Sequence, residues 1–209
     1  MRVGVWDLPV RLVHWLLVLL VPFSWWTARE ELMAWHYRSG LAVLGLLTFR
    51  IVWGLIGSST ARFAGFVRGP RALFDYLHGR SGFVLGHSPL GALSVVALLL
   101  LLSFQVGLGL FAADEDGLES GPLAHLIESE TAEEMAELHG TNFELLKWLI
   151  LLHVAAILYY RLARGKKLVA PMVTGRTDAP PGTPAMEPAG PTRFLIALAA
   201  AAAAVWAVA

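Results

Sequence analysis

Apolar residues along this chain fall into four long runs that are separated by shorter polar and charged segments. The runs cover approximately residues 9–28, 32–57, 89–113 and 143–160. Each is close to the roughly 20 residues that an α-helix needs to cross the hydrocarbon core of a bilayer. Within lipid, a helix satisfies its own backbone hydrogen-bonding groups. The pattern therefore predicts an all-α integral membrane protein built as a four-helix bundle.

The fourth run lies within a longer helical pattern, residues 131–164, that begins and ends in polar sequence. Thr131 followed three residues later by Glu134 has the form of a capping box and predicts the helix start. His139 and His153 lie fourteen residues apart, which returns them to within about 40° of the same face and separates them by roughly 21 Å along the axis. One helix would thus present two imidazoles in one direction at two depths.

The remaining boundaries divide the chain into a membrane domain, a linker and a terminal helix. Ser88 is a natural N-cap and Pro89 suits the first helical position, so the third helix is expected to begin there. Residues 1–176 form the predicted membrane domain, and the Pro/Gly/Ala-rich residues 177–192 a linker without core-forming capacity. The alanine-rich segment 193–209 is expected to be a fifth, C-terminal transmembrane helix, although a loosely held tail is the alternative.

Composition supports a membrane location and excludes several cofactors. Hydrophobic residues make up 56% of the chain and charged residues only 15%, well away from the averages for soluble proteins. The formal net charge is zero, so nothing favours nucleic-acid binding. The absence of cysteine excludes thiolate-held iron–sulfur clusters, covalent c-type haem attachment and disulfides.

The charges are distributed unevenly, and this predicts an orientation. The connection between the second and third helices and the segment after the fourth carry nine basic residues: Arg62, Arg68, Arg71, Arg80, Arg161, Arg164, Lys166, Lys167 and Arg176. The connection at 114–142 has no Lys or Arg and carries nine acids: Asp114, Glu115, Asp116, Glu119, Glu128, Glu130, Glu133, Glu134 and Glu137. By the positive-inside rule, the N-terminus is cytoplasmic and the acidic loop 114–142 is periplasmic.

This orientation sorts four histidines into two pairs. His36 and His139 fall near the outer side, and His14 and His153 near the inner side. Two facing imidazoles are the expected ligands of a six-coordinate haem iron, which has no open position and so favours electron transfer. Zinc would need three or four ligands at one depth. The simpler alternative for any one of these histidines is an interfacial polar residue.

Arginines near the histidines are candidate partners of haem propionates. Arg50 lies inside the second helix, where an unpaired charge is costly and where a carboxylate could bind it with bidentate geometry. Arg11 and Arg62 are further candidates for the inner haem and Arg38 for the outer one. Snorkelling towards the lipid headgroups is the alternative for Arg11 and Arg38.

Positions can also be predicted for the three other histidines and for five glycines. His78, His87 and His125 lie in the connections and are expected at the surface. Five helical glycines are expected to let helices approach the face of a macrocycle: Gly40, Gly45, Gly54, Gly107 and Gly109.

A series of motifs resembles the bacterial cytochrome b561 family, which includes the cytochrome b subunits of membrane-bound nickel–iron hydrogenases. In chain order they are VWDLPVRLVHWLL, HYRSGLAVLGLLTFRIVWGLIGS, ARFAGFVRGP, GHSPLGAL, LHVAAILYYRL and MVTGR. The resemblance covers about residues 4 to 176. It implies a four-helix bundle in the bacterial inner membrane that holds two non-covalent b haems, ligated by His14, His36, His139 and His153.

The resemblance also implies electron exchange between the quinone pool and a redox partner, either a c-type cytochrome or another oxidoreductase subunit. The acidic loop could steer a basic c-type cytochrome, or it could serve only solvation. Two alternatives stay open. One is a haem-bearing anchor subunit of a hydrogenase-like complex without its own quinone site. The other is a haem-free transporter whose His and Arg residues form a proton or solute relay.

Overall fold

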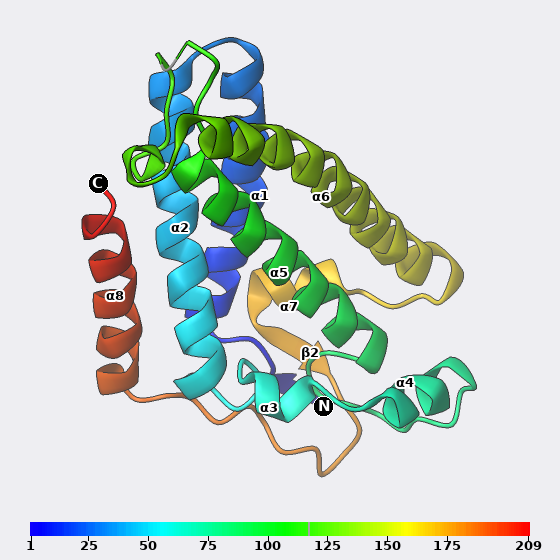
Figure 1. Ribbon diagram of the computed structural model, residues 1–209. Coiled ribbons are helices and arrows are strands. Elements are labelled where there is room, and N and C mark those ends of the chain that lie inside the picture. The colour runs from blue at the N-terminus through cyan, green and yellow to red at the C-terminus, as the bar shows by residue number, and fades with distance from the viewer. Residues whose placement is uncertain (117) are drawn as a thin grey trace. The chain divides into compact units, whose positions relative to one another are not determined.

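The structure is a computed structural model that describes residues 1–116 and 118–209 (Figure 1). Among these residues, four helices are long and apolar enough to cross a membrane: α1 (Leu8–Arg29), α2 (Met33–Ile56), α5 (Pro89–Phe111) and α6 (Ser129–Ala163). The shorter elements are β1 (Arg2–Gly4), α3 (Phe63–Phe66), α4 (Pro70–Leu77), a 3-10 turn η1 (Ala124–Leu126), α7 (Val169–Thr174), β2 (Arg176–Asp178) and α8 (Pro191–Trp206). The predicted all-α membrane fold with four spans is confirmed.

Two predicted helix starts have different outcomes. Ser88 caps α5 as predicted, because its Oγ accepts a hydrogen bond from the Gly91 N–H at 3.2 Å. The capping box predicted at Thr131 is wrong, since α6 begins at Ser129 and Thr131 already lies in its first turn. The Ala132 N–H donates to the Glu128 carbonyl at 3.0 Å, so the helical hydrogen bonding starts before Thr131.

Contacts between residues divide the chain into two compact units. The first unit comprises Met1–His14, Arg50–Ala97 and Leu152–Ala197, and the second comprises Trp15–Phe49, Leu98–Leu151 and Leu198–Ala209. Each predicted histidine pair falls within a single unit. His14 and His153 belong to the first unit, and His36 and His139 to the second.

The second unit has a small aliphatic core with an apolar exterior. Val43 and Leu47 of α2 meet Leu102 of α5 and Leu146 of α6 in the centre of this core. Many large apolar side chains instead point outward, and the indole of Trp148 is 66% exposed. An apolar exterior around a small core is what a bilayer requires of helices that face lipid.

In the first unit, residues 177–192 are more ordered than a plain linker. β2 pairs antiparallel with β1 at the start of the chain, with Arg2 opposite Asp178. The Met186 N–H donates to the Gly4 carbonyl at 3.0 Å, and the Glu187 carbonyl accepts from the Ser59 N–H at 3.1 Å. The predicted linker therefore fastens two other segments of the first unit.

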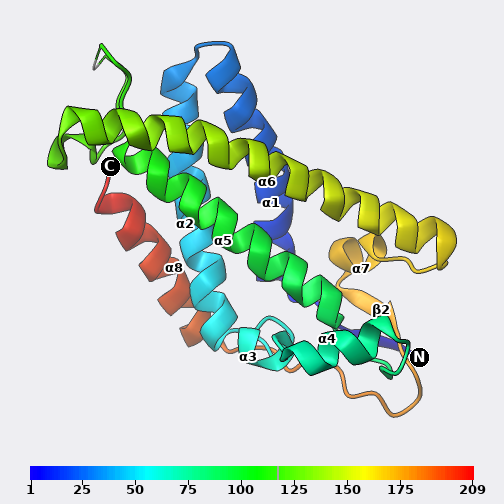
Figure 2. The ribbon, with the colours of Figure 1, turned by 45° about the vertical axis from the view of Figure 1, so that its right-hand side comes forward.

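Helix α8 lies beside α2 in both views (Figures 1 and 2). In the first unit, the rings of Phe194 and Trp53 meet edge to face with centroids 6.1 Å apart. In the second unit, a Cβ added to Gly45 would lie 3.2 Å from Val205 Cγ2, so Gly45 admits α8 rather than a macrocycle. Ala197 and Ala201 are buried. The contacts contradict a loosely held tail, while a membrane-spanning role for 193–209 stays a prediction.

The segment after α5 folds back onto the end of that helix within the second unit. The Gly121 N–H donates to the Ala112 carbonyl at 2.7 Å, and the Leu123 N–H donates to the Leu110 carbonyl at 2.8 Å. A Cβ added to Gly121 would lie 2.2 Å from the Gly109 carbonyl oxygen. Because backbone cannot yield as a flexible side chain can, only glycine fits at this close approach.

We expect Gly121→Ala to lower the free energy of unfolding by about 1–3 kcal/mol, the usual cost of overpacking. SDS-titration unfolding of the purified protein measures this change. Gly69→Ala is the control, since a Cβ there meets nothing within 4 Å and its φ of −65° suits alanine. Equal stability of the two variants would contradict the close approach.

Candidate functional site

His36 on α2 and His139 on α6 face each other in the second unit. Their ring centroids are 6.0 Å apart and the two rings are nearly perpendicular, at 82°. Nδ1 of His36 lies 2.9 Å from the Ser24 carbonyl oxygen of α1. Nδ1 of His139 lies 2.9 Å from the Gln105 carbonyl oxygen of α5. Each imidazole is thus held by a helix other than its own.

These two hydrogen bonds determine which nitrogen of each ring is available to a ligand. A carbonyl oxygen only accepts, so Nδ1 carries the proton in both rings and Nε2 keeps its lone pair. An imidazole nitrogen binds a metal at about 2.0 Å, which places the centroids of two opposed rings about 6 Å apart. The observed separation of His36 and His139 therefore fits one metal ion between them.

A cavity of about 510 Å³ contains this pair, and side chains from α1, α2, α5 and α6 line it. Its volume lies within the usual range for cofactor sites. Gly40 and Gly109 line it as predicted, and a Cβ added to Gly109 would lie 2.8 Å from His139 Cε1. The donor set and the tautomers fit an iron-containing cofactor held by His36 and His139, and Gly109 makes room for the His139 ring.

A buried polar contact lies next to His139 and was not anticipated. The Asn142 side-chain amide on α6 donates to Gln105 Oε1 at 2.7 Å and to the Leu101 carbonyl at 3.1 Å. Gln105 thereby binds α6 through both its side chain and its backbone carbonyl. The sequence contained a signal for this contact, because Gln105 interrupts an otherwise apolar α5.

The second predicted pair lies in the first unit. His14 of α1 and His153 of α6 lie close enough to interact electrostatically, and both are partly buried. Nδ1 of His153 is 3.2 Å from the Ser94 hydroxyl on α5. The structure therefore brings together both pairs of candidate ligands, although their role as ligands stays a prediction.

The four candidate propionate partners lie in different environments. Arg50 is 6% exposed, and its NH1 lies 3.4 Å from the Ala61 carbonyl oxygen. Arg62 is half-buried in the same unit. Arg11 instead donates from NH1 to the Val173 carbonyl at 2.5 Å and so holds α7. Arg38 is exposed, with its guanidinium carbon 5.3 Å from the Trp35 ring centroid.

One expectation about the other histidines is wrong. His78 and His125 are exposed as predicted. His87 is only partly exposed, because its ring contacts those of Trp6 and Phe66 and its Nδ1 is buried. Its position in a Gly- and Ser-containing connection gave no sign of this burial.

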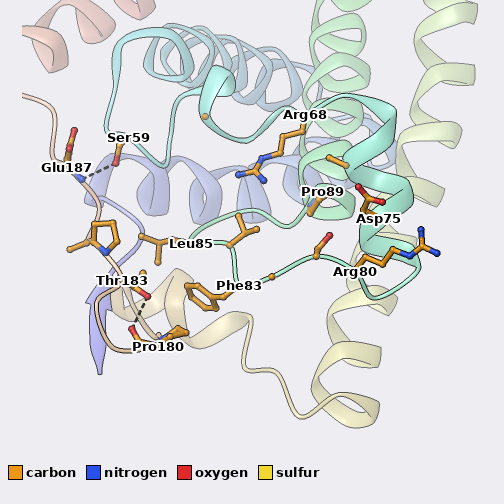
Figure 3. A pocket seen from close by; sticks show the side chains of 17 residues that line it. Ser59, Arg68, Asp75, Arg80, Phe83, Leu85, Pro89, Pro180, Thr183 and Glu187 are labelled. Atoms are coloured by element: carbon orange, nitrogen blue, oxygen red, sulfur yellow. Dashed lines mark hydrogen bonds between the residues drawn. The ribbon is translucent and has the colours of Figure 1, made fainter.

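A second cavity of about 840 Å³ lies in the first unit, between the connection at 59–89 and the segment at 180–187 (Figure 3). Charged side chains of both signs stand around it: Arg68, Asp75, Arg80 and Glu187. No histidine lines it, so it offers no axial ligand for iron. Across the described residues, no group of three or more His, Cys, Asp or Glu is placed to hold a metal ion, and a zinc site therefore gains no support there.

Apolar spanning helices that bring histidines together in two places are typical of a multi-pass membrane cytochrome. The chain belongs to the prokaryotic cytochrome b561 family, whose model matches residues 5–175. The resemblance seen in the motifs is thereby confirmed. No curated protein and no solved structure matches the chain. As a family member, the protein is a b-type membrane cytochrome that binds haem b and takes part in electron transfer.

The Ser94–His153 contact can be tested because a side chain, not backbone, supports this imidazole. If His153 is a haem ligand as predicted, Ser94→Ala should speed haem loss from the first unit by about tenfold or more, since removing an outer hydrogen bond to a ligand histidine costs 10–100-fold in affinity. Haem transfer to an apo-globin acceptor, followed by absorbance, measures the rate. Ser103→Ala on the same helix is the control, and equal rates in both variants would contradict a supporting role for Ser94.

Proposed function

We propose that this protein holds two b haems, one in each unit, and transfers electrons between membrane quinone and a redox partner. The facing, carbonyl-anchored imidazoles of His36 and His139 carry this proposal. Membership of the cytochrome b561 family supports it. The same membership favours it over a haem-free transporter.

In this proposal His36 and His139 bind the iron of one haem, and His14 and His153 bind the other. A bound haem b supplies a one-electron redox centre. The carbonyls of Ser24 and Gln105 keep the axial rings oriented, which holds both ligands in place without waiting for side chains to reorganise. The apolar cavity wall excludes water and thereby contributes to the redox potential.

We further propose that the protein lies in the bacterial inner membrane with its N-terminus in the cytoplasm and the loop 114–142 in the periplasm. All nine acids of this loop are exposed, and none of them forms an ion pair within the described residues. Such a surface suits a basic partner, such as a c-type cytochrome, because unpaired charges contribute to long-range attraction.

The haem assignment predicts a specific pattern of loss. The purified protein should contain two b haems per chain by the pyridine haemochrome assay. His139→Ala should lose the haem of the second unit and His14→Ala that of the first, so each variant should hold one haem. His78→Ala, which replaces an exposed imidazole, should keep two. Retention of both haems by His139→Ala would refute the pairing.

The partner assignment predicts a salt dependence. Electron transfer to a basic c-type cytochrome should slow at least tenfold as ionic strength rises from roughly 10 to 200 mM, because salt screens the attraction. Stopped-flow mixing measures this rate. Neutral replacement of Glu115, Asp116 and Glu119, three of the nine acids, should weaken the dependence without removing it. A rate that does not change with salt would leave the loop with a solvating role only.

Quinone exchange is tested separately with a short-chain quinol. Reduction of the haems by quinol at rates that saturate with concentration supports a quinone site. Reduction by dithionite but not by quinol would instead identify a haem-bearing anchor subunit.

A further inference from the structure

The first unit contains a buried arginine without a matching anion. Arg50 is 6% exposed, and no carboxylate of the described residues forms an ion pair with it. Its recorded hydrogen bond, from NH1 to the Ala61 carbonyl, is long at 3.4 Å. A buried charge without a partner costs several kcal/mol, so a missing anion is the physical expectation at this position.

The one acid nearby is already committed to other donors. Asp7 Oδ1 accepts from the Val10 N–H at 2.8 Å, and Oδ2 accepts from the Trp53 indole N–H at 2.8 Å. Asp7 is near enough to interact with Arg50 electrostatically, yet it lies beyond ion-pair distance. It therefore caps α1 and leaves the guanidinium without a carboxylate at ion-pair distance.

A continuous row of aromatic contacts connects Arg50 to His87. The guanidinium carbon of Arg50 lies 5.0 Å from the centroid of the Phe63 ring. Phe63 contacts Phe66 at 5.7 Å, and Phe66 contacts His87 at 4.4 Å between centroids. Trp6 closes the row on the other side of His87, at 4.5 Å.

Two glycines make this row possible. A Cβ added to Gly54 would lie 2.1 Å from Phe63 Cε2. Gly54 therefore makes room for the Phe63 ring and not for a macrocycle. Gly86 has a φ of +94°, a backbone conformation that suits glycine and that turns the chain immediately before His87. The imidazole is therefore held in its place by the fold on both sides.

His87 has an unused polar atom in this buried setting. Its Nδ1 is buried and has no hydrogen-bond partner among the described residues. Buried polar atoms in native proteins nearly always have a partner. Burial lowers the pKa of His87 to about 3, with smaller contributions from Arg50 and His153. The ring is consequently neutral and carries one N–H that can donate to an acceptor.

We propose that Arg50 and His87 form an anion pocket in the first unit that binds a carboxylate, namely a propionate of the haem held by His14 and His153. This inference rests on the proposed function. A guanidinium and a neutral imidazole N–H together match the oxygens of one carboxylate. The two residues lie 37 positions apart in sequence, and the fold brings them close enough to interact electrostatically.

His87→Phe tests the pocket while keeping a ring between Trp6 and Phe66. Removing a donor leaves the carboxylate charge less compensated, which stabilises the ferric state. The reduction equilibrium of the haem in the first unit should therefore shift at least tenfold towards oxidised, or 59 mV for one electron. Potentiometric titration of the holoprotein measures both haems, and the absorbance component lost in His14→Ala identifies the one in the first unit.

The controls separate hydrogen bonding from packing. His78→Phe makes the same change at an exposed position and should leave both potentials unchanged. His87→Gln restores a side-chain N–H and should recover most of the shift. The inference is overturned if His87→Phe behaves as His78→Phe does, if His87→Gln matches His87→Phe, or if the other haem shifts instead.

A second measurement identifies the source of the carboxylate. It also tests the pocket if the His87→Phe variant binds haem poorly. The parent protein and His87→Leu, which also removes the N–H donor, are reconstituted with haem whose propionates are methyl esters. The potential of the first unit should then respond less than tenfold to substitution at position 87. A full response with the ester would mean that another anion, such as a lipid phosphate, occupies the pocket, and would overturn the propionate assignment.

The two proposals fail in distinguishable ways. A protein without two haems per chain contradicts the proposed function before position 87 is tested. A two-haem protein that quinol reduces, with unchanged potentials in His87→Phe, leaves that function intact and removes only the anion pocket.

Discussion

The hydrogen bond from an imidazole Nδ1 to a carbonyl oxygen of a neighbouring helix is the interaction on which the rest of the site depends. Inside a bilayer a polar N–H has no water to bind, so each ring must find an acceptor within the protein. Ser24 and Gln105 supply it through their backbone. A helical carbonyl can accept a second hydrogen bond because it has two lone pairs. The result is a pair of rings whose free nitrogens are directed by the helices themselves.

The two units orient their imidazole rings with different hydrogen-bonding groups. In the second unit, a main-chain carbonyl accepts from each imidazole, and a substitution does not remove it, although the Ser24 hydroxyl also lies 3.2 Å from His36 Nδ1. In the first unit, the recorded partner of His153 Nδ1 is the side chain of Ser94, and the nearby charge is the buried guanidinium of Arg50. Side chains can vary during evolution without changing the fold. In the proposed two-haem arrangement, the potential of the haem in the first unit would accordingly be the easier one to adjust.

The sequence was sufficient to predict whatever depends on periodicity and helix length. Four spans, the membrane location and the distribution of His14, His36, His139 and His153 into two pairs all follow from an apolar pattern and a fixed rise per residue. The features that it did not predict depend on contacts between distant segments. Gly45 and Gly54 looked alike in sequence, yet one contacts Val205 of α8 and the other the Phe63 ring.

His87 shows the same limit more clearly. A histidine between glycine and serine in a connecting segment has the sequence context of an exposed residue. Its burial depends on Trp6 and Phe66, which lie 81 and 21 positions away, and on the backbone turn at Gly86. Residues 177–192 also lacked any hydrophobic pattern, because their order comes from main-chain hydrogen bonds to Gly4 and Ser59. A local sequence pattern does not predict hydrogen bonds between such distant segments.

The pairing of β1 with β2 has a consequence for biosynthesis. Strand β1 precedes all four spanning helices in the chain, but its partner follows them. At about 5–20 residues per second, the delay is on the order of ten to thirty seconds. Val3 and Val5 are both buried in the folded protein. Until β2 has been synthesised, they lack this partner strand. The pairing of β1 with β2 is therefore a late step, which can occur only after all four spanning helices have been synthesised.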